Sequence, residues 1–213
     1  QAELAKKLSF FLFDSKPQLP VFVLEGYAGT GKTTMVSSLV KALDEFSIRS
    51  QLLAPTGRAA KVLATYAEKP ASTIHRKIYF IHTGSGGEVR LNLAPNKHKN
   101  TLFIVDEASM IPTHNSGENS FFREHNLLED LIEYVFTGEN CRLLLLGDPA
   151  QLPPVGSDQS PALDIEFLKS NYFLDLTHFI LTEVVRQADN SQILGTATLI
   201  RNKITNDNES LPV

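Results

Sequence analysis

The loop GYAGTGKTT, residues 26–34, has the residue types and spacing of a site for the phosphates of a nucleoside triphosphate. It fits G-x-x-x-x-G-K-[ST], with Gly26, Gly31, Lys32 and Thr33 in the fixed positions. Glycines let backbone N–H groups curve around phosphate oxygens, Lys32 can reach the β- and γ-phosphates, and the Thr33 hydroxyl can ligate Mg²⁺. A strand-like run before the loop and helical spacing after it favour this interpretation over a chance glycine-rich turn. The expected phosphate-binding residues are Gly26, Ala28, Gly29, Thr30, Gly31, Lys32, Thr33 and Thr34.

A pair of acidic residues, Asp106 and Glu107, follows the apolar run of TLFIVDEASM. A carboxylate at the end of a buried strand is well placed to hold Mg²⁺ through water, and the adjacent Glu107 can take the proton of an attacking water. The alternative for an Asp-Glu pair is the N-terminus of a helix. We favour the catalytic interpretation because the same chain carries the phosphate-binding loop.

The stretch LLLLGDPAQLPPVG, residues 143–156, again ends an apolar run at a polar turn. Gln151 can contact a γ-phosphate, and two successive prolines stiffen the loop that carries it. A stiff loop that senses the γ-phosphate can transmit hydrolysis to other parts of a protein. The alternative is a proline-rich connector, which explains the prolines but not the Gly-Asp pair and the glutamine.

The elements that must position these residues alternate along the chain. Apolar runs predict strands, at residues 21–25, 51–54, 101–105, 143–146 and 178–182. Helical spacing predicts helices, at residues 4–12, from the loop to about 46, 57–67 and 126–136. This order predicts an α/β fold with a parallel sheet and helices on both faces, whose functional loops lie at the carboxyl ends of the strands. The sequence HTGSGGEV between β-prone flanks predicts an inserted hairpin at about 78–95, and residues 112–120 read as a polar loop.

Composition narrows the class of protein. The chain has 213 residues, 42% hydrophobic and 21% charged, which is ordinary for a globular protein. No apolar run approaches the ~20 residues of a membrane span, and the six histidines have no metal-ligand spacing. The single cysteine, Cys141, is expected to be a buried thiol, so no disulfide forms within the chain. We therefore expect a cytoplasmic protein with no membrane partner.

Charge is unevenly distributed, although the net charge is only −4. The stretch 49–103 holds nine basic and two acidic residues, and the stretch 106–175 holds three basic and thirteen acidic ones. A chain divided in this way can present a basic surface to nucleic acid while its total charge stays acidic. Uneven solvation of the surface is the alternative.

Six stretches, in this order, resemble the motifs of superfamily 1 DNA helicases of the RecD-like (exonuclease V alpha-subunit) branch. They are GYAGTGKTT at 26–34 (motif I), LLAPTGRAAKVL at 52–63 (Ia), STIHRKIY at 72–79 (Ib), VDEAS at 105–109 (II), GDPAQLPPVG at 147–156 (III) and LTEVVRQ at 181–187 (IV). The resemblance implies a RecA-like P-loop NTPase fold, ATP and Mg²⁺ as cofactors, and 5′-to-3′ movement on single-stranded DNA. It also implies that the predicted hairpin is the small strand-separating insertion of this branch.

The resemblance assigns roles by position. Lys32, Thr33, Asp106, Glu107 and Gln151 take the roles given above. In addition, Arg186 would stabilise charge on the γ-phosphate, although a lone arginine there could be a surface ion pair, and Gln1 would read the adenine. The positions expected to line the single strand are Pro55, Thr56, Arg58, Ser72, Thr73, His75 and Arg76. A capping or core role is an equal alternative for the histidine, and the basic stretch spans motifs Ia and Ib, which favours contacts with the DNA backbone.

These helicases contain two RecA-like motor domains, and only 27 residues follow Arg186. We expect residues 1–190 to form the first motor domain and 191–213 a C-terminal helix and polar tail. The second motor domain would be absent, so that the chain is a truncated piece, a proteolytic remnant or a degenerate gene product that cannot unwind DNA alone. Two alternatives to a helicase motor domain remain: another P-loop enzyme, such as a kinase or loader ATPase, and a non-catalytic nucleotide-gated DNA-binding module. The Asp-Glu pair and GDPAQLPPVG argue against a small-molecule kinase.

Overall fold

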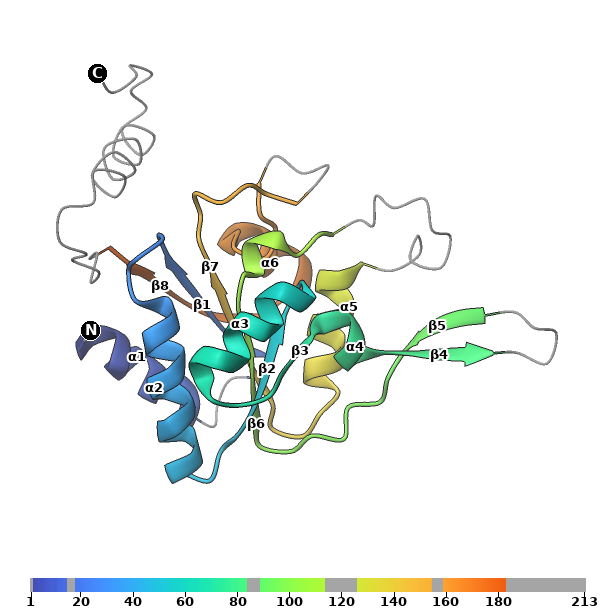
Figure 1. The fold of residues 1–213 in the computed structure, drawn as a ribbon, viewed down its shortest axis with the longest axis horizontal. Helices are drawn as coiled ribbons and strands as arrows, with labels where there is room; N and C mark the ends of the chain where they lie inside the picture. Colours follow the sequence, from blue (N-terminus) through green and yellow to red (C-terminus); the bar gives the residue numbers. More distant parts are fainter. Residues whose placement is uncertain (1, 15–17, 84–88, 114–125, 155–158, 183–213) are drawn as a thin grey trace, which may run out of the picture.

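A six-stranded parallel sheet forms the centre of the molecule (Figure 1). The computed structural model describes residues 2–14, 18–83, 89–113, 126–154 and 159–182. The strand order is β3-β2-β6-β7-β1-β8, and every pairing is parallel. The strands are β1 (Pro20–Gly26), β2 (Arg49–Ala54), β3 (Ala71–Thr73), β6 (Thr101–Val105), β7 (Arg142–Gly147) and β8 (Asp175–Leu181).

Two apolar cores cover the two faces of this sheet. Alternate residues of one strand belong to different cores, as Leu143 and Leu144 of β7 show. The first core packs the sheet against α4 (Ile74–Ile78), α5 (Leu127–Phe136) and α6 (Ile165–Tyr172). The second packs it against α1 (Ala2–Phe13), α2 (Lys32–Glu45) and α3 (Gly57–Ala67). The predicted α/β fold with helices on both faces is confirmed.

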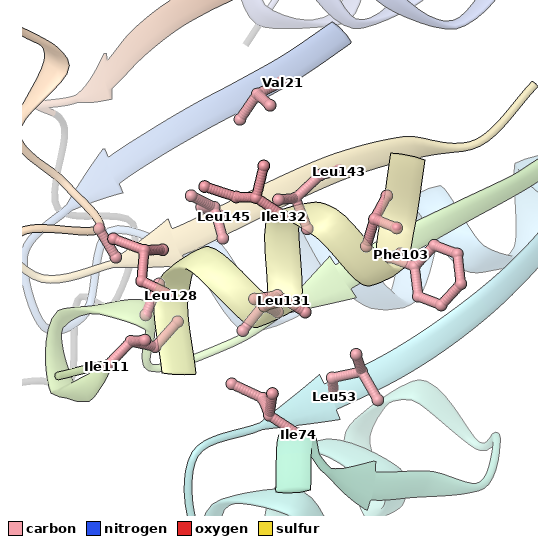
Figure 2. Packing of buried hydrophobic residues seen from close by; sticks show 14 of the residues in the cluster. Val21, Leu53, Ile74, Phe103, Ile111, Leu128, Leu131, Ile132, Leu143 and Leu145 are labelled. Atoms are coloured by element: carbon pink, nitrogen blue, oxygen red, sulfur yellow. The ribbon is translucent and has the colours of Figure 1, made fainter. Parts of the chain in front are cut away.

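The contact between α5 and the sheet shows how this burial works (Figure 2). Ile132 of α5 lies next to Leu143 and Leu145 of β7, and all three side chains are buried in one core with Leu128 and Leu131. Strand β7 buries a continuous apolar run, because a parallel strand covered on both faces exposes no side to water, whereas α5 buries only its apolar face. The central strands are therefore rigid supports for the loops at their carboxyl ends.

The predicted hairpin is also confirmed. Strands β4 (Tyr79–Thr83) and β5 (Val89–Leu93) pair antiparallel and project away from the sheet (Figure 1). The Ala94 N–H donates to the Ile78 carbonyl over 2.7 Å and closes the base of the hairpin directly after α4.

Some elements differ from the sequence prediction. The five predicted strands are present: β6 has the predicted bounds, β1, β2 and β7 are each two residues longer than predicted, and β8 starts three residues earlier, at Asp175, and ends one residue earlier. Strand β3, helix α4, helix α6 and the 3₁₀ turn η1 (Ala108–Met110) were not predicted, because each is too short to show a clear apolar period. Cys141 is buried as expected and lies directly before β7. Most of the polar loop 112–120 and all of the expected C-terminal helix and polar tail, 191–213, lie outside the described residues.

Within the described part of the chain, no helix is long and apolar enough to cross a membrane. The same residues contain no group of three or more His, Cys, Asp or Glu side chains that could hold a metal ion.

Candidate nucleotide and nucleic-acid sites

Three neighbouring strands bring the first candidate site together. Strands β6, β7 and β1 lie side by side and run in the same direction. Asp106 follows β6, Asp148 follows β7, and the loop that begins at Gly26 follows β1. Because parallel strands end at the same edge, the sheet places the loop and both carboxylates at one end of the molecule.

The loop itself has the backbone of an anion cradle. Gly29 and Gly31 have φ angles of 83° and 87°, which only glycine adopts without strain. Thr30 donates to the Tyr27 carbonyl through both its N–H, over 3.2 Å, and its Oγ1, over 2.8 Å. Gly31 is the N-cap of α2 and has no side chain that could accept a hydrogen bond. The backbone N–H groups at the start of this helix are therefore not capped by a side chain and can donate to an anion in the loop. A Cβ at Gly26 would lie 2.6 Å from Thr30 Oγ1, which explains the glycine there.

Lys32 lies inside this cradle. Its Nζ donates to the carbonyl of Gly26 and, over 3.1 Å, to that of Tyr27. The same atom lies 4.0 Å from Asp148 Oδ2. The ammonium group is therefore held by oxygens of the protein.

Asp106 is largely buried at the end of β6. Burial, followed by the negative charge of Glu107, raises the pKa of Asp106, while the Glu107 N–H and the charge of Lys32 act in the opposite direction. The N–H bond to Asp106 Oδ1 is 3.0 Å long. Glu107 has a left-handed φ of 56°, which costs a non-glycine residue ~1 kcal/mol or more, and it caps the 3₁₀ turn η1.

A polar link joins the segment after β6 to the loop after β7. Ser109, which is fully buried, donates through Oγ to Gln151 Oε1 over 2.8 Å. The Ala150 N–H donates to Asp148 Oδ1 over 2.9 Å, and the Gln151 N–H to the Asp148 carbonyl over 3.2 Å. Ser160 Oγ donates to the Ser109 carbonyl over 2.8 Å. Asp148 thus forms the turn that presents Gln151, and neither Asp148 nor Ser109 was among the predicted site residues.

A groove of about 470 Å³ runs between α1 and α2. Thr30, Gly31 and Thr34 form one part of its wall, so the groove is continuous with the phosphate loop. Leu4 and Leu8 of α1 contribute apolar walls. This surface can accept a flat apolar group attached to bound phosphates.

The second candidate site lies at the same edge of the sheet, beyond β6. Strands β2 and β3 pair with Ala54 opposite Thr73, so the helices that follow them begin side by side. Thr56 caps α3 by accepting from the Ala59 N–H over 3.2 Å, and Thr73 caps α4 by accepting from the Arg76 N–H over 3.2 Å. The fold thereby brings motifs Ia and Ib together, with the side chain of Arg76 exposed to solvent.

The remaining residues that were predicted to contact single-stranded DNA lie in the same region. Pro55 and Ser72 are half-buried, Arg58 is exposed, and Ser72 Oγ donates to the Thr73 carbonyl over 2.9 Å. The His75 ring is partly buried and lies 5.8 Å from the Tyr79 ring, centroid to centroid. Burial lowers the pKa of His75, which favours its neutral form.

Gln1 and Arg186, expected to contact the adenine and the γ-phosphate, lie outside the described residues.

Comparison with known proteins identifies the family. The family model described as an AAA domain matches residues 16–209. The chain belongs to this AAA domain family. Within it, the chain is 35% identical over 133 residues to the ATP-dependent RecD2 DNA helicase of Deinococcus radiodurans, covering 62% of this chain and 16% of that protein. It is 30% identical over 182 residues to the ATP-dependent DNA helicase dda of phage T4, covering 84% and 37%.

These relatives identify this AAA domain as a superfamily 1 helicase domain of the RecD-like type. A protein of uncharacterised function from Acanthamoeba polyphaga mimivirus is 31% identical over 209 residues, covering 88% of this chain and 38% of that protein. The chain thus spans less than two fifths of the length of each of these three relatives.

Solved structures show the same fold for this AAA domain. Bacteroides Pif1 in complex with ADP-AlF4 aligns with a TM-score of 0.56 at 20% identity, covering 99% of this chain and 47% of that one. Pif1 helicase from Candida albicans aligns with a TM-score of 0.56 at 18% identity, covering 94% and 43%. The predicted RecA-like architecture is therefore confirmed.

Proposed function

We propose that this chain is the ATP-binding motor domain of a DNA helicase that moves 5′ to 3′ along single-stranded DNA. The observation that carries the proposal is the shared edge of the sheet. The phosphate loop, the Asp106–Glu107 pair and Gln151 meet at the ends of β1, β6 and β7, and motifs Ia and Ib lie next to them at the ends of β2 and β3. The relatives named ATP-dependent DNA helicases support this proposal.

Each nucleotide-site residue has a definite task in this proposal. The loop N–H groups and Lys32 bind the phosphates, and the apolar groove between α1 and α2 takes the base, with Gln1 contributing to its recognition. Thr33 and Asp106 hold Mg²⁺, which neutralises charge on the phosphates when it is bound. Glu107 takes the proton of the attacking water, and Gln151 contacts the γ-phosphate. Arg186 stabilises charge on the same phosphate.

The DNA surface consists of the starts of α3 and α4. Helix N-termini and exposed arginines bind phosphates without reading the base sequence. Arg58 and Arg76 supply the positive charge, and the capping residues Thr56 and Thr73 hold the two helix starts in place. Pro55, Ser72 and His75 complete the surface, and the hairpin β4–β5 projects from α4 beside it.

Unwinding requires a second motor domain in cis, against which this domain closes on ATP. Such a domain supplies an arginine to the γ-phosphate that is worth ~10³ to 10⁵ in rate. We therefore expect the 213-residue chain alone to bind ATP weakly, to hydrolyse it slowly and not to separate a duplex. One RecA-like sheet among the described residues also favours a second candidate function for the isolated chain, a nucleotide-gated DNA-binding module without turnover.

The test compares ATP turnover with and without single-stranded DNA, on this chain and on a protein that joins it to a second motor domain. The motor function predicts turnover by the two-domain protein that DNA stimulates. Phosphotransfer to a small acceptor without DNA would instead indicate a kinase. DNA binding without turnover in the two-domain protein would leave only the binding module.

A further inference from the structure

Asp148 is the one fully buried Asp, Glu, Lys or Arg in the described part of the chain, with 5% of its surface exposed. Burying a carboxylate is unfavourable unless hydrogen bonds and opposite charge compensate. Two compensating contacts are present: the Ala150 N–H at 2.9 Å and Lys32 Nζ at 4.0 Å. The side chains of this ion pair are only 7% and 15% exposed, so water screens it weakly.

The proposed function requires Lys32 to contact the β- and γ-phosphates. One ammonium group has three donors, and here it already meets the carbonyls of Gly26 and Tyr27 beside the carboxylate of Asp148. Phosphates that enter the loop must therefore compete with these oxygens for Lys32. When Lys32 turns to the nucleotide, Asp148 loses a compensating charge while it remains buried.

Asp148 also forms the turn that carries Gln151, since its Oδ1 accepts from Ala150 N–H and its carbonyl from Gln151 N–H. Loss of the positive charge of Lys32 next to Asp148 therefore acts directly on this turn. Leu152, the next residue, is 88% exposed, so the turn has space in which to move.

We propose that Asp148 is a positioning residue that competes with phosphate for Lys32 and transmits the departure of Lys32 to the Gln151 loop. This inference rests on the proposed nucleotide site. The Asp148 carboxylate competes with phosphate for Lys32. When Lys32 binds phosphate instead of Asp148, the Gln151 loop changes its position, which links nucleotide binding to this loop during the ATPase cycle.

The first test measures ADP affinity by calorimetry in wild type and in Asp148→Asn. Asparagine keeps the shape and an acceptor for the Ala150 N–H but removes the charge. Removing a competitor at 4.0 Å should tighten ADP binding by about 10-fold. Damage to the fold would weaken binding, so tighter binding separates the proposed role from a merely structural one.

The matched control is Asp164→Asn. Asp164 also accepts a backbone N–H through Oδ1, from Phe167 over 3.0 Å, but it caps α6 away from the phosphate loop. This variant should bind ADP as wild type does. If Asp148→Asn does not give a wild-type circular dichroism spectrum, Asp148→Ser replaces it, because the serine hydroxyl is neutral and can still accept from Ala150.

The second readout follows the loop. The chain has no tryptophan, so Leu152→Trp introduces a single fluorescent reporter at an exposed position. ADP should change its emission when Asp148 is present, and Asp148→Asn should abolish that change although it binds ADP more tightly. A wild type that binds no ADP would overturn the nucleotide site and this inference together. Unchanged or weaker ADP binding by a folded Asp148→Asn, or a Trp signal that persists in it, would overturn this inference alone.

Discussion

Ser109 Oγ donates a hydrogen bond to Gln151 Oε1 over 2.8 Å. The two residues are 42 positions apart in the sequence, and they connect the segment that carries Asp106 and Glu107 to the loop that carries Gln151. Ser109 is fully buried, whereas Gln151 is exposed. The bond therefore holds the exposed Gln151 side chain, which we propose contacts the γ-phosphate, against a buried serine.

Ser109→Ala removes the hydrogen bond that orients Gln151 and leaves the phosphate loop at 26–34 unchanged. Because water can replace the serine at the exposed glutamine, the loss of stability should be small, about 0.5–1.5 kcal/mol. We expect ADP affinity to stay within about twofold of wild type, and DNA-stimulated turnover of the two-domain protein to fall by about 10-fold, the effect of ~1.4 kcal/mol on a rate. Turnover equal to wild type would show that Gln151 needs no support from Ser109.

Glu107→Gln separates nucleotide binding from hydrolysis. Glutamine keeps the shape of the side chain but cannot accept the proton of the attacking water, so hydrolysis should fall by roughly 10²-fold or more while binding persists. The measurement is ATP turnover by the two-domain protein, beside ATP affinity by calorimetry. Glu133→Gln, on α5, is the control and should leave both unchanged. Normal hydrolysis in Glu107→Gln would exclude this residue as the base.

Arg58 and Arg76 should bind single-stranded DNA through its phosphates. Replacing both by alanine is expected to lower the slope of log affinity against log salt concentration by about one to two units, near one for each lost contact. The measurement is fluorescence anisotropy with unrelated oligonucleotides at several salt concentrations. Lys41→Ala with Lys169→Ala, which removes two exposed charges from α2 and α6, is the control. An unchanged slope in the double arginine variant would show that single-stranded DNA does not contact Arg58 and Arg76.

His75 makes the stability of the fold depend on pH. Burial lowers its pKa in the folded protein, whereas the unfolded chain has a pKa near the ordinary value of about 6.5. The unfolded state therefore takes up a proton first, so stability is fully present above about pH 6.5 and is lost as pH falls through the folded pKa. His75→Gln should lose less stability than wild type between about pH 7 and 5, as urea unfolding would measure. The exposed His82→Gln is the control, and equal losses in wild type and His75→Gln would contradict the assignment.

Strands and the phosphate-binding loop could be predicted from the sequence, because each depends on residue types within one short stretch. Five apolar runs became strands because a sheet covered on both faces needs continuous apolar residues, and the loop at 26–34 could be recognised because phosphate binding needs glycines at fixed positions. Since parallel strands end at one edge, the meeting of this loop with Asp106 followed from the order of elements.

Other parts of the site depend on contacts between distant segments. Strand β3 has only three residues, Ala71–Thr73, and forms because β2 lies beside it. The bond from Ser109 to Gln151 and the approach of Lys32 to Asp148 depend on side-chain positions in the folded protein. The apolar run that ends in Gly147-Asp148 could have indicated Asp148 as a site residue. That Lys32 is its partner could be seen only in the folded structure.

The most direct test of the account is calorimetric titration of ATP with Mg²⁺ into wild type, Lys32→Ala and Lys41→Ala. Both lysines lie on α2, but Lys32 faces the phosphate loop, whereas Lys41 pairs with Glu68 over 3.4 Å at the exposed end of the helix. We expect weak but measurable binding by wild type and Lys41→Ala, and none by Lys32→Ala. Equal affinity in Lys32→Ala and wild type would contradict the assignment of this loop to ATP, and with it the motor function.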